Sequence, residues 1–289
     1  MFATFQFQEL IDGALKEDIG TGDLSTRILP EDLTGTAKLY AKQKGVVAGL
    51  WLVEQVFQRM DSRILVHRLL NDGDEVNVGV VVLEISGPLS SILQGERTAL
   101  NFLQHLSGIA TATKRAVDQV AGLSVSIVDT RKTLPGWRTL QKYAVRVGGG
   151  QNHRFGLYDA VMLKDNHIAA VGGLTEAVKR IKTQVGHMIK IEVECETLEQ
   201  VHEAVTCGVD VIMLDNMDLV AMRKAVQYID QRAIVEASGG IQENRLHEVA
   251  ETGVDLISIG ALTHSVKALD FSLDLGDIKA STRASWERS

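Results

Sequence analysis

The sequence lacks several features that would assign it to a class at once. Its 289 residues include only two cysteines, Cys195 and Cys207, and no CxxC pair. This scarcity argues against a disulfide framework or a zinc site and is typical of a reducing cytosol. No apolar run reaches the roughly 18 residues that a membrane helix needs, and the beginning of the chain lacks the basic and apolar segments of a signal peptide. We therefore expect a cytoplasmic protein without a membrane partner.

Positive charge is also scarce. The chain has 30 Lys and Arg against 37 Asp and Glu, a formal net charge of −7. Because nucleic-acid phosphates demand cationic surfaces, we expect no nucleic-acid partner. The histidines form no HxxxH pair, and the glycines at 148–150 lack GxGxxG spacing and follow no apolar strand. Neither a histidine metal site nor a dinucleotide-binding loop is therefore indicated.

Two patterns of secondary structure follow each other along the chain. Strand-like runs at 36–41, 64–70 and 80–86 precede a helical stretch from about 95 to 120. From there on, short apolar strands alternate with amphipathic helices, and the strands are predicted at 125–129, 160–163, 189–193, 211–214, 233–236 and 256–259. Such repetition predicts parallel pairing with right-handed crossovers. Six or seven units of this kind favour an α/β barrel, with a doubly wound sheet as the alternative.

Polar residues follow every one of these apolar runs. The strands end in DTRKT, MLKDNH, EVECE, MLDN, EASGG and SIGAL. In parallel barrels the chemistry gathers at the carboxyl ends of the strands. A purely structural barrel would not need polar residues in all six places, so we predict a functional site at this rim.

The cations of this rim are Arg131, Lys132 and Lys164, and His153-Arg154 lies in the loop before the second strand. A single lysine or arginine is usually a solvated surface charge. Four cations and a histidine at one barrel mouth would repel each other unless an anion lies among them. We therefore expect a polyanionic ligand, whose carboxylates or phosphates are bound by guanidinium groups.

Acidic residues and glycines complete the rim. Glu194 and Asp215 could meet a divalent cation or a ribose diol. Alternatively, they could balance neighbouring charges or cap helices, since Asp215 precedes a helix expected near Met217. Ser238-Gly239-Gly240 and Gly260 follow the last two strands, where barrels commonly bind phosphate through backbone N–H groups. Tight turns without a ligand are the alternative for these glycines.

The longest motif resembles a known enzyme family. DTRKTLPG (129–136), KYA (142–144), GGG (148–150), HR (153–154) and LKDNH (163–167) together resemble quinolinate phosphoribosyltransferases, also called nicotinate-nucleotide pyrophosphorylases (carboxylating). The segments at 17–18, 22–23, 96–101, 192–194, 214–216 and 236–240 are similar to the same family. The similarity runs from about residue 10 to 275, and only the tail from Gly276 lies outside it.

The resemblance implies an architecture and an assembly. Residues 1–120 would form an N-terminal α/β sandwich domain with a long connecting helix, 121–275 an incomplete, open α/β barrel of six or seven strands, and 276–289 a C-terminal tail. Members of the family form homodimers, from which higher oligomers can be built. The N-terminal domain of one subunit covers the barrel mouth of the other, and Arg97 resembles the arginine that reaches the neighbouring site.

The resemblance also implies a reaction, namely phosphoribosyl transfer from phosphoribosyl pyrophosphate to quinolinate with decarboxylation. The product would be nicotinate mononucleotide, an intermediate of NAD biosynthesis. Lys132, Glu194 and Asp215 would be catalytic, with Glu194 and Asp215 holding Mg²⁺ directly or through water. The residues that would bind quinolinate are Arg97, Thr130, Arg131, His153, Arg154 and Lys164. Those that would bind phosphoribosyl pyrophosphate are Lys132, Glu194, Asp215, Ser238, Gly239, Gly240 and Gly260.

Two alternatives stay open. The first is a related phosphoribosyltransferase for nicotinate or another aromatic acid, such as the homologue tied to molybdenum uptake, although a monoacid needs fewer cations. The second is a catalytically silent barrel that binds a phosphorylated metabolite or a partner protein. The combination of Lys132, Glu194 and Asp215 with both glycine turns argues against the second.

Overall fold

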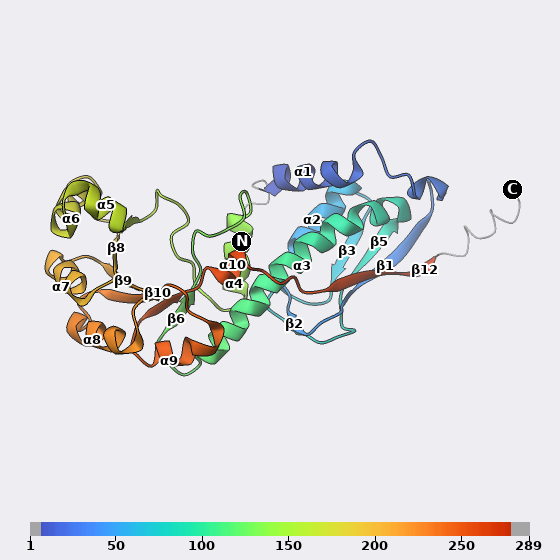
Figure 1. Ribbon diagram of the computed structural model, residues 1–289. Helices are drawn as coiled ribbons and strands as arrows, with labels where there is room; N and C mark the ends of the chain where they lie inside the picture. The colour runs from blue at the N-terminus through green and yellow to red at the C-terminus, as the bar shows by residue number, and fades with distance from the viewer. Residues whose placement is uncertain (1–6, 279–289) are drawn as a thin grey trace, which may run out of the picture. The chain divides into compact units, whose positions relative to one another are not determined.

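The computed structural model describes residues 7–278, which divide into two compact units (Figure 1). The first unit contains the residues up to Thr111 together with those from Val266 on, and the second runs from Ala112 to Ser265. None of the helices among the described residues combines the length and the apolar content that crossing a membrane would require.

An antiparallel sheet with strand order β12-β1-β5-β3 forms the centre of the first unit. Its strands are β1 (Thr34–Ala41), β3 (Leu65–Arg68), β5 (Val81–Pro88) and β12 (Phe271–Ile278), and a separate pair is formed by β2 (Gly45–Val46) and β4 (Glu75–Val76). Burial alternates along β1, where Ala37, Leu39 and Ala41 are inaccessible to solvent. One face of the sheet is therefore apolar and needs a cover. Strands β1, β3 and β5 confirm the three strands predicted in this region.

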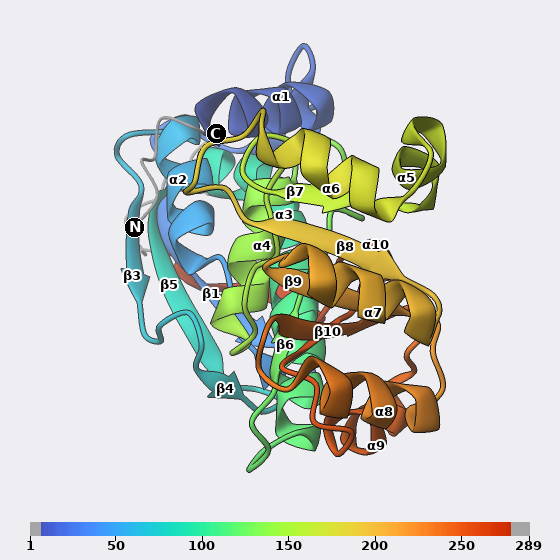
Figure 2. The ribbon, with the colours of Figure 1, turned by 90° about the vertical axis from the view of Figure 1, so that its left-hand side faces the viewer.

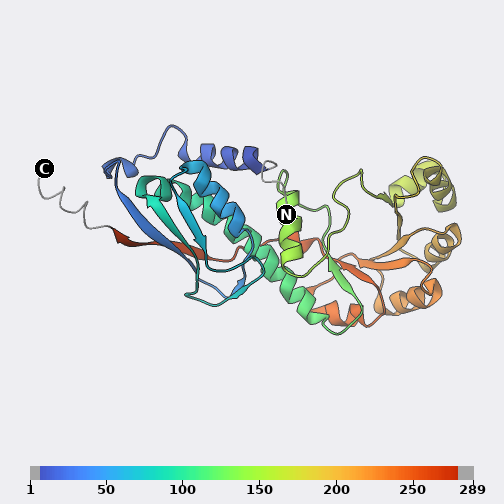
Figure 3. The same ribbon diagram turned by 180° about the vertical axis from the view of Figure 1, so that it is seen from behind.

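Helices supply that cover in the first unit. They are α1 (Gln8–Ile19), α2 (Leu50–Met60) and the first part of α3 (Leu89–Gln119), with a short 3₁₀ turn η2 (Thr26–Ile28). Figure 3 shows α2 and α3 beside the antiparallel strands. Asp72 caps α2, because its carboxylate accepts hydrogen bonds from the N–H groups of Gly49 and Leu50, both at 2.9 Å. The predicted long helix is confirmed, but it begins at Leu89, directly after Pro88, whose fixed φ suits a helix start.

Six parallel strands form the sheet of the second unit, in the order β6-β11-β10-β9-β8-β7. Their bounds are β6 (Ser126–Val128), β7 (Val161–Leu163), β8 (Ile191–Cys195), β9 (Val211–Asp215), β10 (Ile234–Ser238) and β11 (Leu256–Ser258). The first strand pairs with the last, whereas β6 and β7 do not pair, so the barrel has one open seam. This confirms the incomplete α/β barrel. The order is cyclic and shows no reversal within the sheet, which excludes the doubly wound alternative.

The seam is partly filled by the segment that connects β6 to β7. This connection contains α4 (Arg138–Val147) and a loop in which Gln151 forms a single parallel bridge to Val128. The N–H of Gln151 donates to the carbonyl of Ile127 at 2.8 Å, and the N–H of Asp129 donates to the carbonyl of Gln151 at 3.2 Å. The loop thus takes the place of a seventh strand beside β6, but with very few ladder hydrogen bonds.

The outer layer of the second unit consists of helices that follow the strands. They are α5 (Asp165–Val171), α6 (Leu174–Lys182), α7 (Leu198–Cys207), α8 (Leu219–Ile229), α9 (Leu246–Ala250) after the 3₁₀ turn η3 (Glu243–Arg245), and α10 (Ala261–His264). Figure 2 shows α6, α7 and α8 side by side along the sheet. Asp218 caps α8 by accepting a hydrogen bond from the N–H of Ala221 at 2.8 Å. Asp215 is therefore not the N-cap of this helix, and the capping alternative for it is excluded.

The unit boundaries differ from the predicted ones. We predicted divisions after residues 120 and 275, whereas the units change after Thr111 and Ser265. The first boundary falls inside α3, where the helical periodicity is continuous and nothing in the sequence marks a change of unit. At the second, Phe271 and Leu273 of β12 pair with Ala41 and Leu39 of β1, so this segment belongs to the antiparallel sheet and not to the barrel. The predicted tail thus begins inside β12, and its residues 279–289 lie outside the described part of the chain.

Candidate active site

Side chains of the parallel strands alternate between the helical layer and the barrel interior, as the two-residue period of a strand requires. On β8 and β9 the apolar residues Val193, Cys195, Ile212 and Leu214 are fully buried. The residues between and after them line a cavity of about 1080 Å³ at the carboxyl ends of the strands. From β7 to β11 these are Met162, Lys164, Glu194, Met213, Asp215, Glu236, Ser238 and Ser258.

Every predicted site residue of the second unit lines this cavity. The set comprises Thr130, Arg131, Lys132, His153, Arg154, Lys164, Glu194, Asp215, Ser238, Gly239, Gly240 and Gly260. The sequence did not single out four further lining residues, Arg115, Asn216, Glu236 and His264. Arg97 lies on α3 in the first unit, so its role stays a prediction. The structure thus brings the polar strand ends together, while the ligand that each residue binds is still a prediction.

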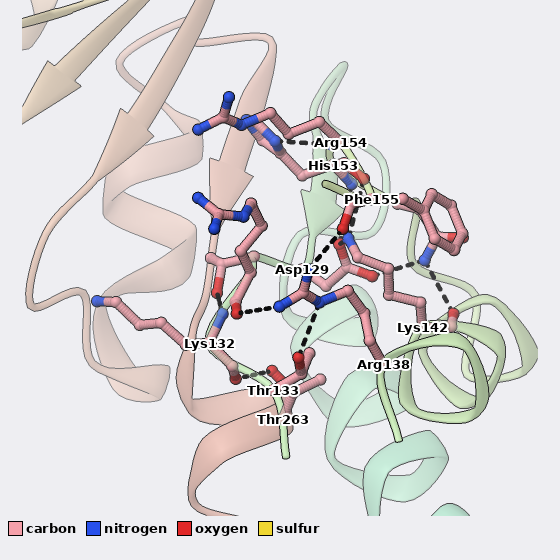
Figure 4. Close-up of polar contacts among 12 residues, drawn as sticks. Asp129, Lys132, Thr133, Arg138, Lys142, His153, Arg154, Phe155 and Thr263 are labelled. Atoms are coloured by element: carbon pink, nitrogen blue, oxygen red, sulfur yellow. Dashed lines mark hydrogen bonds and ion pairs between the residues drawn. The ribbon is translucent and has the colours of Figure 1, made fainter. Parts of the chain in front are cut away.

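Lys132 is fixed by its own loop and by the glycine opposite. The Thr130 hydroxyl accepts a hydrogen bond from the N–H of Lys132 at 3.0 Å, and the Lys132 carbonyl accepts one from the Thr263 hydroxyl at 2.8 Å (Figure 4). A Cβ atom at Gly260 would lie 2.9 Å from Cδ of Lys132. The glycine therefore leaves the space that the lysine stem occupies.

Positive charge is concentrated in the same cavity. Burial lowers the pKa of Arg154, and repulsion from Arg131 lowers it further, so the two guanidinium groups are close enough to interact. Arg154 also donates a hydrogen bond to the carbonyl of Ala160 at 3.1 Å. Lys164 forms an ion pair with Glu194. The predicted cluster of cations is therefore present, and Glu194 balances part of it.

The turns after β9 and β10 approach each other closely at the rim. The carboxylate of Asp215 accepts a hydrogen bond from the side-chain amide of Asn216 at 2.8 Å, and the N–H of Asn216 donates to the Ser238 carbonyl at 3.0 Å. Gly239 and Gly240 have φ values of 91° and 58°, in the left-handed region that favours glycine. A Cβ atom at Gly239 would lie only 2.4 Å from Oδ1 of Asn216. This turn therefore requires glycine for its conformation and for its space.

Comparison with known proteins identifies the family. The model of the quinolinate phosphoribosyl transferase C-terminal domain matches residues 109–274, and that of the N-terminal domain matches 23–107. The chain belongs to the quinolinate phosphoribosyltransferase family. It is 46% identical to a probable nicotinate-nucleotide pyrophosphorylase [carboxylating] of Bacillus subtilis, with 93% of each chain covered. It is 41% identical to quinolinate phosphoribosyltransferase [decarboxylating] 2, mitochondrial, of Nicotiana glauca, over 94% of this chain and 83% of the relative. The solved structure of NadC from Streptococcus pyogenes has a TM-score of 0.92 and 43% identity, covering 96% of this chain and 99% of that one.

This quinolinate phosphoribosyltransferase family member has a buried polar cluster around His153. Nε2 of His153 lies 3.1 Å from Oε2 of Glu192 and 3.4 Å from Oε2 of Glu236. Burial alone would lower the pKa of His153, but the two carboxylates outweigh it and raise the pKa to about 10. Burial likewise raises the pKa of Glu192. Both shifts mean that the cluster retains a proton at neutral pH.

The cluster suits a proton better than a metal ion, although its three side chains lie close enough together to hold one. The backbone N of Arg154 lies 2.8 Å from Nδ1 of His153, so Nε2 is the ring nitrogen that faces the glutamates. Because the raised pKa keeps the ring protonated at neutral pH, Nε2 carries a proton and has no lone pair for a metal ion. Both carboxylates lie within ion-pair distance of this nitrogen, and they therefore stabilise its proton.

A second buried network was missed by the sequence analysis. Lys142 of α4 forms an ion pair with Asp129, and the side chains of both are inaccessible to solvent (Figure 4). Both residues lie within the motifs that resemble the family, but no role was predicted for them from the sequence. A signal was available, because Lys142 lies three residues before the buried Val145 and so falls on the apolar face of its helix. A lysine in that place needs a buried partner.

Proposed function

We propose that this protein transfers the phosphoribosyl group of phosphoribosyl pyrophosphate to the ring nitrogen of quinolinate, with loss of one carboxyl group as CO₂. The products are nicotinate mononucleotide and pyrophosphate, so the reaction belongs to NAD biosynthesis. The observation that carries the proposal is the meeting of Arg131, Arg154 and Lys164 with Glu194 and Asp215 in one cavity beside a glycine turn. The names of the relatives support the same reaction.

The cationic part of the cavity suits a dicarboxylate. Arg131 and Arg154 repel each other, and a ligand with two carboxylates removes that cost while accepting hydrogen bonds from the guanidinium groups. A monocarboxylate such as nicotinate would leave part of the charge uncompensated. We assign quinolinate to Arg97, Thr130, Arg131, His153, Arg154 and Lys164.

The glycine turn suits a phosphate group. Because Gly239 and Gly240 have no side chains, an anion can approach their backbone closely. Lys132 adds a positive charge to the same cavity. We assign phosphoribosyl pyrophosphate to Lys132, Ser238, Gly239, Gly240 and Gly260, with Glu194 and Asp215 directed to its ribose.

The reaction requires no nucleophile from the protein. The pyridine nitrogen attacks the anomeric carbon as the bond from that carbon to pyrophosphate breaks, and the sugar becomes oxocarbenium-like. Lys132 stabilises the departing pyrophosphate, while Glu194 and Asp215 stabilise the cationic sugar. After transfer the ring nitrogen is positive. The bond from C2 to its carboxylate then breaks, the adjacent pyridinium stabilises the electron pair left on C2, and a solvent proton completes the nicotinate ring.

Glu194 and Asp215 also fit a Mg²⁺ ion. Magnesium prefers oxygen ligands and commonly uses one or two carboxylates together with substrate phosphates. These two carboxylates come from neighbouring strands and line the same cavity. When bound, the ion would neutralise charge on the pyrophosphate. We expect activity to be lost in a chelator and restored by added Mg²⁺, and full activity in the chelator would contradict this assignment.

We further propose a homodimer in which Arg97 of the partner subunit completes each quinolinate site. The resemblance of residues 96–101 to the family supports this role. Arg97→Ala and Arg131→Ala should each be inactive alone. After the two variants exchange subunits, one site in each mixed dimer is intact, so about a quarter of the wild-type activity should return. No recovery, in a preparation that light scattering shows to be dimeric, would exclude a role for Arg97 across the interface.

A cytoplasmic location is part of the same proposal. Cys195 and Cys207 are both free, and Cys195 is buried. Free thiols are typical of proteins in a reducing compartment.

The direct test mixes purified protein with quinolinate, phosphoribosyl pyrophosphate and Mg²⁺. Nicotinate mononucleotide should appear together with an equimolar amount of CO₂. A parallel reaction contains nicotinate in place of quinolinate and should be much slower. Conversion of nicotinate without conversion of quinolinate would contradict the proposal and favour a monoacid substrate.

A further inference from the structure

The buried pair of Asp129 and Lys142 has no direct part in the proposed chemistry. Both side chains are inaccessible to solvent. Their burial carries a desolvation cost, which raises the pKa of Asp129 and lowers the pKa of Lys142. Apolar residues of similar volume often stabilise a fold at least as well as a buried ion pair. Stability alone therefore does not explain the pair.

The hydrogen bonds of the pair converge on the loop that carries His153 and Arg154. Nζ of Lys142 donates to the carbonyl of His153 at 2.9 Å, and Oδ1 of Asp129 accepts from the N–H of His153 at 2.9 Å (Figure 4). Both polar groups of the His153 backbone are therefore bound by this one ion pair. The side-chain amide of Asn152 adds bonds to Oδ2 of Asp129 at 2.6 Å and to the Lys142 carbonyl at 2.8 Å.

These hydrogen bonds restrain a loop that strand pairing holds only weakly. The loop lies at the open seam of the barrel, where β6 and β7 do not pair. Elsewhere on the rim, ladders of strand hydrogen bonds fix the residues that precede the site. At the seam only the isolated bridge between Val128 and Gln151 is present among the described residues. The ion pair therefore supplies the positional restraint that the missing ladder cannot.

We infer that Asp129 and Lys142 are positioning residues for dicarboxylate recognition, fixing the loop at the seam so that His153 and Arg154 face the carboxylates of the substrate. The inference rests on the proposed function. Lys142 is the sharper probe, because Asp129 directly precedes the Thr130–Lys132 segment and so acts on the phosphate side as well. Misplacing charged groups by even an ångström can cost large factors in rate or binding.

The test compares Lys142→Met with the double variant Asp129→Asn/Lys142→Met. Lys142→Met should raise the KM for quinolinate at least about tenfold and change the KM for phosphoribosyl pyrophosphate by less than about threefold. It should also lower the melting temperature, because it leaves Asp129 buried without its cation. The double variant removes both charges and should recover much of the melting temperature, but not the KM for quinolinate.

Two controls separate this role from a merely structural one. Met222→Ala removes a buried side chain of α8 that is only 3% exposed, and it should lower the melting temperature while leaving both KM values unchanged. The inference is overturned if the double variant recovers both stability and the KM for quinolinate, or if the two KM values rise together in Lys142→Met. Wild-type protein is assayed in parallel. If it fails to convert quinolinate, the proposed function fails. If the wild type is active and Lys142→Met has the same KM for quinolinate, only the inference is overturned.

Discussion

The two units use charged side chains in different ways. In the first unit, Arg59 and Asp12 pair at 2.5 Å with side chains 60% and 43% exposed, so solvent screens their attraction. In the second unit, Lys142 pairs with Asp129 in full burial, and His153 pairs with two buried glutamates. Among the described residues, the buried charged groups therefore concentrate in the unit that carries the cavity.

The architecture of the sheets explains this difference. An antiparallel sheet covered on one face leaves its other face to solvent, so its polar residues need no buried partner. A barrel encloses its inward-facing residues, and the inward residues here include Glu192 and Glu236. Once enclosed, such groups must find a partner or retain a proton. Burying these polar groups therefore costs free energy. Removing one partner of a buried pair should have a larger effect than removing one partner of an exposed pair.

Replacing Arg131 should give the largest effect. Without this guanidinium, a carboxylate of quinolinate loses its partner in a partly dry pocket, so kcat/KM for quinolinate in Arg131→Ala should fall about 100-fold or more. Initial rates at varied quinolinate measure this. Arg180→Ala is the matched control, because Arg180 is an exposed arginine of α6 paired with Glu176. Unchanged quinolinate kinetics in Arg131→Ala would refute the assignment.

A smaller but clear effect is expected at the glycine turn. Gly239→Ala combines a φ of 91° with a Cβ placed 2.4 Å from Asn216, so it should raise the KM for phosphoribosyl pyrophosphate and cost about 1–3 kcal/mol in stability. Gly122→Ala is the control, since Gly122 has a φ of 86° and nothing within 4 Å of the added Cβ. Thermal unfolding and kinetics of both variants separate the effect of backbone strain at positive φ from the effect of the contact between the added Cβ and Asn216. Equal behaviour of the two would show that the contact with Asn216 is unimportant.

The buried cluster predicts a dependence of stability on pH. The folded-state pKa of His153 is raised from 6.5 to about 10, so its contribution is complete below pH 6.5 and is lost as the pH rises toward 10. The melting temperature should fall over this window by several degrees, at about 2–4 °C for each kcal/mol. The slope should be flatter in His153→Gln. Calorimetry across the window checks this, and parallel slopes for the two proteins would show that the cluster does not hold the proton.

Much of the fold was predictable because the pattern is local. Each strand from β7 to β11 is a short apolar run with polar residues after it, and this pattern is visible in the sequence without knowledge of the partners. The place of β12 was not predictable in this way. Its residue Leu273 pairs with Leu39, more than two hundred positions earlier, and no local pattern shows that pairing.

The same distinction between local patterns and long-range contacts applies to the residues of the site. Exposed cations such as Arg131 and Lys164 follow strands directly, so parallel topology alone predicted that they meet. The pair of Asp129 and Lys142 joins a strand end to the interior of a helix, and both residue types usually lie at the surface. The contact of His153 with Glu236 likewise depends on how a loop folds back at the seam. Sequence patterns therefore predicted the rim, whereas the buried contacts that position it depend on tertiary structure.

The smallest effect is expected for a pair of the first unit. Lys38 and Glu84 face each other across β1 and β5 at 3.1 Å, with side chains 44% and 42% exposed. A double-mutant cycle with Lys38→Met and Glu84→Gln should give a coupling of about 0.2–1 kcal/mol, because solvent screens the pair. The coupling should decrease further in high salt. The same cycle on Lys142 and Asp129 should give a clearly larger coupling, since each single change leaves a buried charge unpaired. Equal couplings would mean that burial does not distinguish the two units.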